Sequence, residues 1–273
     1  MSRLNHEHLS RLAIQHLDPA TATSWTALLR PAVQLRAARP GDPVVARLGG
    51  TPQLPDEQAW PDWPGVGPLT CAAEVDLQLL ATLGLRTGLP LPREGRLLAF
   101  CFDDGEALER LDVVAHPSDP VTRLASRLLL APPGAPAAQP LRELTGVQAT
   151  TWPDREHPAL TALGIEELPD DLDEALDELL EEEHPDEEPY HRLGGWAQPL
   201  QSSVEYEAAE SRLAATYDEA HDAEALRWRP LLQVDADASV DTSWSDLGCL
   251  YWLGRDVSDR WPADDDVAFV HQS

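Results

Sequence analysis

One four-residue motif, Arg-Leu-Gly-Gly, occurs twice in this chain, at residues 47–50 and 192–195. Each copy is followed by an apolar run that ends in an acid. A glycine-led run rich in aromatic residues comes next in both places, at residues 95–103 and 248–256. Three matches in the same order indicate a repeated unit, and a repeat constrains the fold more than any single segment does. The sequence therefore predicts one domain with two pseudo-symmetric halves.

The chain between the motifs consists of short apolar runs separated by proline and glycine, which is typical of strands and ordered loops. Apolar residues at helical spacing over residues 4–17, together with the apolar stretch 25–35, predict a helical segment over residues 1–44 that packs on the domain. A further helix is expected over residues 204–227. We expect a mainly β fold with helical insertions (α+β), in the form of an internally duplicated β roll or sandwich.

The main domain is expected to cover residues 45–273. Its predicted parts are a first half at 45–150, an acidic helical insertion at 151–190 and a second half at 191–273.

The charge of the chain excludes several classes of function. All 20 basic residues are arginine and 48 residues are acidic, which gives a net charge of −28. Without lysine, neither Schiff-base catalysis nor a lysine-containing phosphate loop is possible. An acidic surface repels the phosphates of nucleic acids, so no nucleic-acid partner is expected. A basic protein partner is compatible with this charge.

The sequence also predicts the subcellular location of the protein. It has no run of about 20 apolar residues, so we expect no membrane span, and no signal peptide is visible. Cys71, Cys101 and Cys249 lie in apolar, strand-like runs without metal-ligand spacing. Buried, reduced thiols in a cytoplasmic protein are therefore predicted.

Half of the net charge is concentrated between residues 166 and 188, where fourteen of 23 residues are Asp or Glu. Leucines fall on one face of a predicted helix in this block, at Leu172, Leu176, Leu179 and Leu180. The opposite face carries the candidate partner-binding residues Asp173, Glu174, Asp177, Glu178, Glu181 and Glu182. Two main interpretations remain open: a solvated surface helix, or a docking face for a cationic partner. A metal-binding loop is a third, although the Asp-x-Asp-x-Asp-Gly spacing of such loops does not occur here.

The repeated motif also suggests a ligand site, because an arginine beside two glycines can present its guanidinium to a carboxylate or phosphate. In the structural alternative, Arg47 and Arg192 pair with Asp76 and Asp235 inside the fold. In the functional one, both arginines face a cleft between the halves. The candidate ligand-binding residues are Arg47, His191, Arg192, Gln201, Gln233, Asp235, Asp237, Trp244 and Asp246.

The acids after residue 234 allow a calcium alternative. Asp235, Asp237, Ser239 and Asp241 occupy alternate positions, as ligands do in a calcium loop, but Val240 stands where such a loop needs glycine. The competing interpretation is that these acids cap backbone amides in a tight turn. Calcium is thus the alternative cofactor, and otherwise none is expected. No nucleophile elbow and no zinc helix signature occur, so no catalytic residues are predicted.

These motifs together resemble the YwqG-like family of bacterial proteins, a domain of unknown function. The resemblance is carried by ordered motifs over about residues 45–273: 47–55, 60–61, 68–77, 95–102, 191–195, 231–237 and 244–252. It implies a mainly β, internally duplicated, roll-like domain with helical insertions and no established enzyme activity. The chain departs from the family pattern at Ser245, where a glycine is usual, and at Trp196-Ala197.

Two hypotheses about function follow. The first is a non-enzymatic cytoplasmic binding protein that docks or neutralises a basic protein through its acidic surface, by analogy with the immunity role that the resemblance suggests. The second is a site, enzymatic or not, for a small ligand or divalent cation in the cleft between the two halves.

Overall fold

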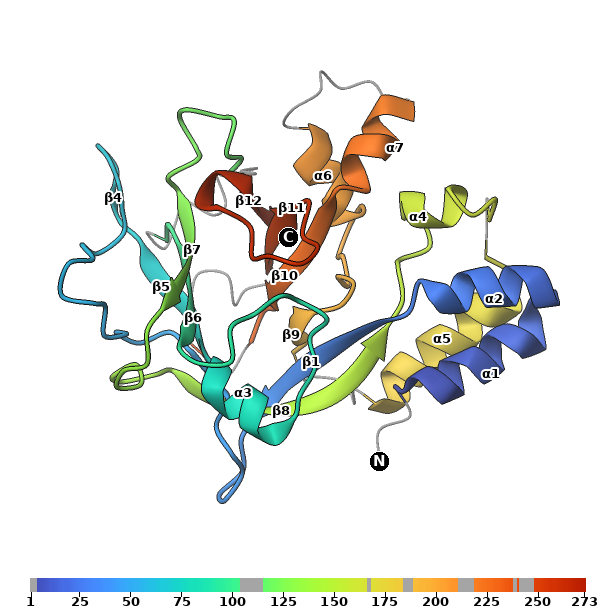
Figure 1. Cartoon of the computed structure of the whole chain (residues 1–273), viewed down its shortest axis with the longest axis horizontal. Coiled ribbons are helices and arrows are strands. Elements are labelled where there is room, and N and C mark those ends of the chain that lie inside the picture. Colours follow the sequence, from blue (N-terminus) through green and yellow to red (C-terminus); the bar gives the residue numbers. More distant parts are fainter. Residues whose placement is uncertain are drawn as a thin grey trace.

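A ten-stranded antiparallel sheet dominates the computed structural model (Figure 1). The structure describes residues 4–103, 115–165, 168–183, 189–210, 219–237, 240 and 248–273. The strand order is β12-β11-β10-β9-β1-β8-β2-β5-β6-β7. The strands are β1 (Arg30–Ala37), β2 (Ala46–Leu48), β5 (Thr70–Asp76), β6 (Arg96–Cys101), β7 (Ser126–Ala131), β8 (Arg142–Thr151), β9 (His191–Gly194), β10 (Trp228–Val234), β11 (Cys249–Arg255) and β12 (Val267–Gln272). A small second sheet pairs β3 (Asp62–Trp63) with β4 (Gly67–Pro68). The prediction of a mainly β fold is confirmed.

The sheet curls around the main hydrophobic core. This core contains at least one buried side chain from each of the ten strands, including Val33 of β1, Leu128 of β7 and Phe269 of β12. Side chains alternate between the two faces of a strand, so residues such as Leu193 and Val33, which pair across β9 and β1, point inward together. Curling lets one sheet enclose its own apolar face.

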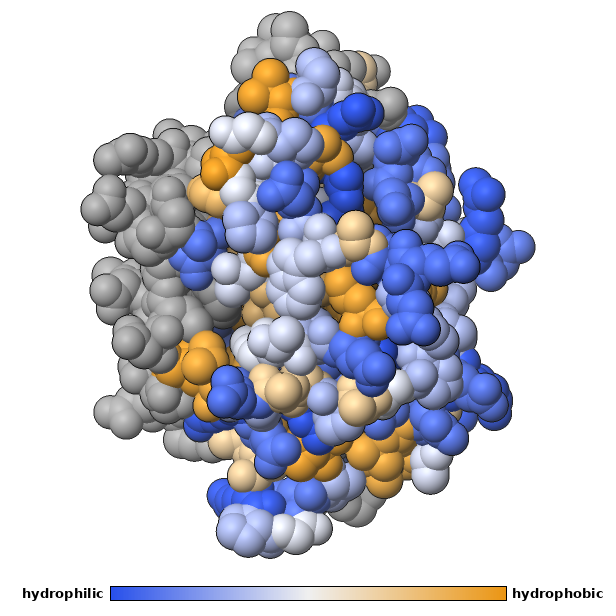
Figure 2. All heavy atoms as spheres, turned by 90° about the vertical axis from the view of Figure 1, so that its left-hand side faces the viewer, coloured by the Kyte–Doolittle hydropathy of each residue, from blue (hydrophilic) through white to orange (hydrophobic). Residues whose placement is uncertain are grey.

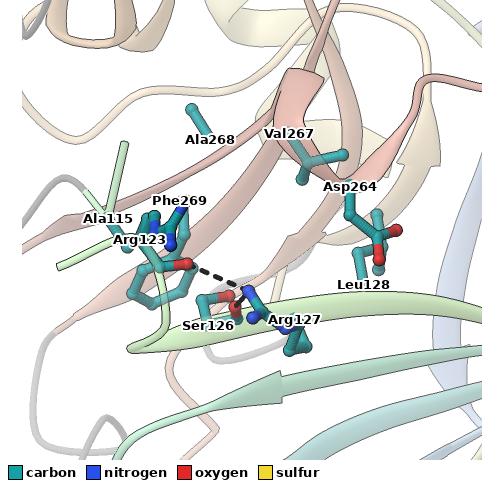
Figure 3. Close-up of a pocket in the computed structure, with 9 residues that line it drawn as sticks. All are labelled: Ala115, Arg123, Ser126, Arg127, Leu128, Asp264, Val267, Ala268 and Phe269. Carbon is teal, nitrogen blue, oxygen red and sulfur yellow. Dashed lines mark hydrogen bonds between the residues drawn. The ribbon is translucent and has the colours of Figure 1, made fainter. Parts of the chain in front are cut away.

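The two ends of the sheet meet at a seam between β7 and β12 (Figure 3). The backbone N–H of Phe269 donates to the carbonyl of Ala115 at 3.0 Å, which forms an isolated antiparallel bridge. A hollow of about 20 Å³ remains between the two strands, with Arg127 on one side and Asp264 on the other. That volume suits about one water molecule, so the sheet is nearly closed.

A helical layer lies beside β1 and β8 (Figure 1). It consists of α1 (His6–His16), α2 (Pro19–Ala27) and α5 (Asp170–Glu183), which share a second hydrophobic cluster. Asn5 and Asp18 cap the first two helices, because their side-chain oxygens accept N–H groups of the first turn. The four predicted leucines of α5 are buried against this layer, so the predicted inner face of the acidic helix is confirmed.

Four shorter helices occur in the described residues: α3 (Leu77–Leu83), α4 (Pro158–Thr161), α6 (Val204–Glu210) and α7 (Glu219–Ala225). The 3₁₀ turn η2 (Asp264–Asp266) precedes β12. Across the described part of the chain, no helix combines the length and the apolar content that crossing a membrane requires.

The helical prediction for the N-terminal part is wrong after Ala27. Residues 30–37 form β1, which pairs with β8 on one side and β9 on the other, near the middle of the sheet. The apolar run that ends at Leu29 has helical spacing, whereas the strand that follows alternates with period two. Pro31, the second residue of β1, is the break between the two patterns, and the prediction carried the helical segment past it.

The single helix predicted over residues 204–227 is also wrong. The hydroxyl of Tyr206 in α6 donates to the carboxylate of Asp222 in α7 at 2.7 Å. In one continuous helix these residues would lie about 24 Å apart. The two short helices instead pack against each other and cover β10, β11 and β12.

The repeated motifs occupy comparable places in the strand order. β2, which carries the first motif, is followed outward by β5, β6 and β7, and β9, which carries the second, is followed outward by β10, β11 and β12. The glycine pairs share a left-handed backbone, with φ of 62° and 83° at Gly49 and Gly50 and of 72° and 77° at Gly194 and Gly195. Non-glycine residues rarely adopt such angles, which explains why both motifs use glycine.

Candidate functional site

Three of the predicted ligand-binding residues come together at the start of β9 and the end of β10. The Nδ1 atom of His191 accepts the backbone N–H of Asp235 at 3.1 Å. Its Nε2 atom lies 3.6 Å from Oδ2 of Asp237. The side chains of His191 and Asp237 are 1% and 2% exposed, so this cluster is held inside the protein.

The counter-charge of this cluster is Arg142, the first residue of β8. Its Nη1 donates to both carboxylate oxygens of Asp237. A charge-assisted contact of this kind compensates a carboxylate that burial would otherwise destabilise. Sequence reasoning missed Arg142, because it lies 95 residues from Asp237 and belongs to no motif. Only a general rule could have pointed to an arginine here: a buried carboxylate needs a positively charged partner.

Asp235 has a different role in the same turn. Its Oδ2 atom accepts the backbone N–H of Tyr190 at 2.7 Å, and its Oδ1 accepts that of Ala236 at 2.9 Å. This is the capping of backbone amides that the sequence offered as the alternative to a calcium loop. The cap ties the beginning of β9 to the end of β10.

The calcium alternative has little support in the described part of the site. The carboxylates of Asp235 and Asp237 already accept N–H donors, and Arg142 places a positive charge beside Asp237. Within the described ranges, no group of three or more His, Cys, Asp or Glu side chains is arranged to hold a metal ion. The other predicted residues, Ser239, Asp241, Trp244 and Asp246, lie outside the described residues.

The two repeated arginines do not share a cleft. Two strands, β1 and β8, separate β9 from β2, which places the motifs about 14 Å apart across the sheet. The Nε atom of Arg47 lies 3.5 Å from Oε1 of Glu143 on β8. Arg192 is buried and donates from Nη1 to the carbonyl of Trp196 at 2.7 Å. Burial lowers the pKa of Arg192 to about 10.

The expected pairing of these arginines with two acids is also wrong. Asp76 caps α3 instead, where its Oδ1 accepts the N–H of Leu79 at 2.9 Å. Asp235 caps the β9 turn as described above. Arg47 and Arg192 therefore make contacts within the fold, as the structural alternative expects, but with Glu143 and the carbonyl of Trp196 as their partners.

The two predicted glutamines stabilise the segment after the second motif. Gln233 pairs with Arg192 in register, and its Oε1 accepts the N–H of Gln198 at 3.0 Å. Gln201 donates from Nε2 to the carbonyl of Ser273 at 2.7 Å. Because neighbouring residues of a strand face opposite sides, Gln233 and Arg192 lie on the face opposite His191. The predicted ligand set is thus divided between two faces of the sheet.

The candidate partner-binding residues form a surface, which we call the acidic face of α5. Its members are the exposed Glu174, Asp177, Glu178, Glu181 and Glu182 and the half-buried Asp173. Arg155 approaches Asp173 at 3.5 Å. Partial burial and the neighbouring charge of Asp173 raise the pKa of Asp177. Concentrated like charge on one helix face attracts cations and repels anions.

The three cysteines carry no reactive site. Cys71, Cys101 and Cys249 are free and buried, as predicted. Burial raises the pKa of the Cys71 thiol to about 12 and raises that of Cys249 well above its usual value. A thiol with so high a pKa is a poor nucleophile at neutral pH.

One comparison with known proteins assigns the chain to a family. A family model described as "Domain of unknown function" (DUF1963) matches residues 46–256. No curated protein matches the chain. The matched segment begins at β2, with the first motif, and ends just after β11. Because it covers well over half of the sequence, the chain belongs to the family described as Domain of unknown function (DUF1963).

Proposed function

We propose that this protein is a non-enzymatic, cytoplasmic binding protein that docks a basic protein partner on the acidic face of α5. The observation that carries the proposal is the position of α5 itself. Its leucines are buried in the helical layer, and five carboxylates of the opposite face are exposed. The buried leucines hold the helix in one place, so the charges form a fixed surface rather than a loose acidic tail.

The physical advantage of such a surface is electrostatic steering. A dense patch of one sign increases the rate at which an oppositely charged protein associates, and salt reduces this effect. A small cationic toxin neutralised by an immunity-type partner fits this chemistry. The free, buried cysteines suit a reducing compartment such as the cytoplasm.

One other face of the molecule offers a less defined interface. Figure 2 shows the side of the molecule that is on the left in Figure 1, where apolar residues form separate patches within a largely hydrophilic surface. Isolated apolar residues are normal on protein surfaces and do not by themselves mark an interface. The proposal therefore assigns recognition to charge on α5.

The test compares two variants of equal net charge. The first neutralises Glu174, Asp177, Glu178 and Glu181 to the corresponding amides. The control neutralises Asp56, Glu57, Glu94 and Asp265, which are also exposed. Lysozyme serves as a folded cationic probe, and its affinity is measured by biolayer interferometry at 50 and 300 mM salt.

We expect the α5 variant to lose roughly tenfold in affinity at low salt, which corresponds to about 1.4 kcal/mol. The control should lose less than about twofold, and high salt should remove most of the difference. Equal losses in both variants would mean that only net charge matters, and would refute a docking role for α5.

A second candidate function rests on the approach of His191 to Asp237. A buried imidazole 3.6 Å from a buried carboxylate is an arrangement that also occurs in ligand sites. If this cluster binds a small ligand or a divalent cation, calcium or magnesium should raise the melting temperature of the wild type. The Asp237→Asn variant should not respond. An unchanged melting temperature in the wild type would favour the protein-partner proposal.

We also propose that the two motif-bearing units arose from one duplicated β unit. The support is the matching strand order on the two sides of β1 and β8 and the shared left-handed glycines. A structure-based superposition of residues 46–101 on residues 191–255 tests this proposal. Coinciding strands would support it, and a different chain direction in any paired strand would refute it.

A further inference from the structure

A groove of about 500 Å³ lies between α3 and the loop that follows it. The helix α3 is at the lower part of the molecule in Figure 1. Its volume falls in the range of small-molecule binding sites. Leu77 and Leu80 of α3 are buried at its base, and Leu85 and Leu89 of the loop pack against the main core. The groove therefore has an apolar base formed by aliphatic side chains.

The rim of the groove is cationic. Arg86 and Arg93 both line it, and both are exposed. Neither guanidinium has an ion-pair partner among the residues that the structure describes. No Asp or Glu is among the residues that line the groove, and the nearest acids in the chain, Asp76 and Glu94, lie just before and just after this stretch. In a chain with 48 acidic residues, this groove is a local positive site.

The loop wall of the groove is held rigidly by polar contacts. The side-chain amide of Gln148 on β8 accepts the N–H of Arg86 at 2.8 Å and donates to its carbonyl at 3.0 Å. Arg229 of β10 donates from Nη2 to the carbonyl of Gly88 at 2.6 Å. Two strands thus fix the loop from different sides. A preformed wall lowers the entropy that a ligand must lose on binding.

We propose that this groove binds a small amphipathic carboxylate, with its aliphatic or aromatic tail on the leucines and its carboxylate at Arg86 and Arg93. Guanidinium groups bind carboxylates by charge-assisted hydrogen bonds. Burial of the tail supplies the remaining affinity, since it removes apolar surface from water. This site is separate from the acidic face of α5 and does not depend on it.

The test uses three probes of eight carbons each: octanoate, octanol and octylammonium. Binding is measured by isothermal titration calorimetry and by competition with a fluorescent fatty-acid analogue. Octanoate is expected to bind with one site and at least tenfold more tightly than octanol. Octylammonium, which the arginines repel, should not compete. Equal affinity for octanoate and octanol, or no saturable binding of octanoate, would refute the proposal.

Five variants, of which two are controls, locate the site. Arg86→Gln and Arg93→Gln should each weaken octanoate binding at least fivefold, whereas Arg39→Gln, an exposed arginine elsewhere, should leave it unchanged. Ala81→Phe fills the groove from α3 and should abolish binding. Its control, Gln78→Phe, lies on the same helix outside the groove and should bind normally.

Circular dichroism and the melting temperature show whether each variant is folded. Octanoate binding that survives in folded Ala81→Phe, or in both folded arginine variants, would place the ligand elsewhere. This result would overturn the groove assignment whether or not α5 binds a basic protein.

Discussion

The indole Nε1 of Trp252 on β11 donates a hydrogen bond of 2.8 Å to the hydroxyl of Ser126 on β7. Both side chains are buried, and the two residues are 126 positions apart in the chain. The Ser126 hydroxyl donates in turn to the carbonyl of Phe100 on β6 at 2.9 Å. One polar chain therefore joins strands from opposite ends of the sheet beside the seam.

We predict that Ser126→Ala destabilises the protein by about 1–3 kcal/mol, because it leaves the buried indole N–H without its acceptor. The same change in a Trp252→Phe background should cost less, since no indole N–H remains to be satisfied. Urea denaturation of the two single variants and the double variant measures the difference. An identical cost in both backgrounds would contradict a role for this bond in joining the ends of the sheet.

Alanine substitution at the first glycine of each motif, Gly49 or Gly194, should destabilise the protein to different extents. A Cβ at Gly194 would lie 2.2 Å from the backbone carbonyl oxygen of Thr87, which cannot move without its loop. At Gly49 the obstacle is the side chain of Leu141, which is 49% exposed and can rotate away. In both variants the left-handed backbone conformation lowers the free energy of unfolding by about 1–2 kcal/mol. Gly194→Ala should cost about 1–3 kcal/mol more, as measured by chemical denaturation. Equal losses of stability in the two variants would indicate that the loop at Thr87 moves easily to make room for the added Cβ atom.

The contact between Arg142 and Asp237 should be one of the most sensitive in the fold. Arg142→Met leaves Asp237, which is 2% exposed, without its guanidinium and should cost about 3–5 kcal/mol. Arg47→Met is the matched control, because the partner of Arg47, Glu143, is 51% exposed. Such a surface pair contributes about 1 kcal/mol or less. Thermal and urea unfolding of both variants check this prediction, and a small effect of Arg142→Met would mean that water reaches Asp237.

A pH dependence is expected from Glu205 at the start of α6. Burial is the largest single influence and acts to raise the pKa of Glu205. The nearby His157, whose Nε2 lies 3.4 Å from Oε1 of Glu205, a backbone hydrogen bond and the charge of Arg30 together lower the pKa further than burial raises it, so that it falls below 4.5 in the folded state. A lowered carboxyl pKa means that the ionised form stabilises the folded state. This contribution is complete above the unfolded value and is lost as pH falls through the folded value.

The measurement compares wild type with Glu205→Gln. The difference in unfolding free energy should be largest at pH 6–7 and should shrink as pH is lowered from 4.5. Glu174→Gln, an exposed control on α5, should change stability by no more than about 0.5 kcal/mol at any of these pH values. A difference that does not vary with pH would show that Glu205 acts through packing and not through its charge.

Local patterns in the sequence predicted much of the fold. Short, continuous apolar runs predicted β5, β6 and β11, and leucines at helical spacing predicted the buried face of α5. The glycine pairs were recognisable because a left-handed backbone requires that residue type almost wherever it occurs. Burial of the cysteines followed from the apolar runs around them.

The sequence by itself thus determined that the segments of β5, β6 and β11 are strands, which face of α5 is buried and where the glycine pairs turn the backbone, because these depend on neighbours within a few residues. Only the tertiary structure decided that β1 lies near the middle of the sheet and that Arg142 reaches Asp237. Each of these depends on strand order, which brings residues many positions apart into contact. No local pattern records strand order, since it is set by how the whole sheet closes around its core.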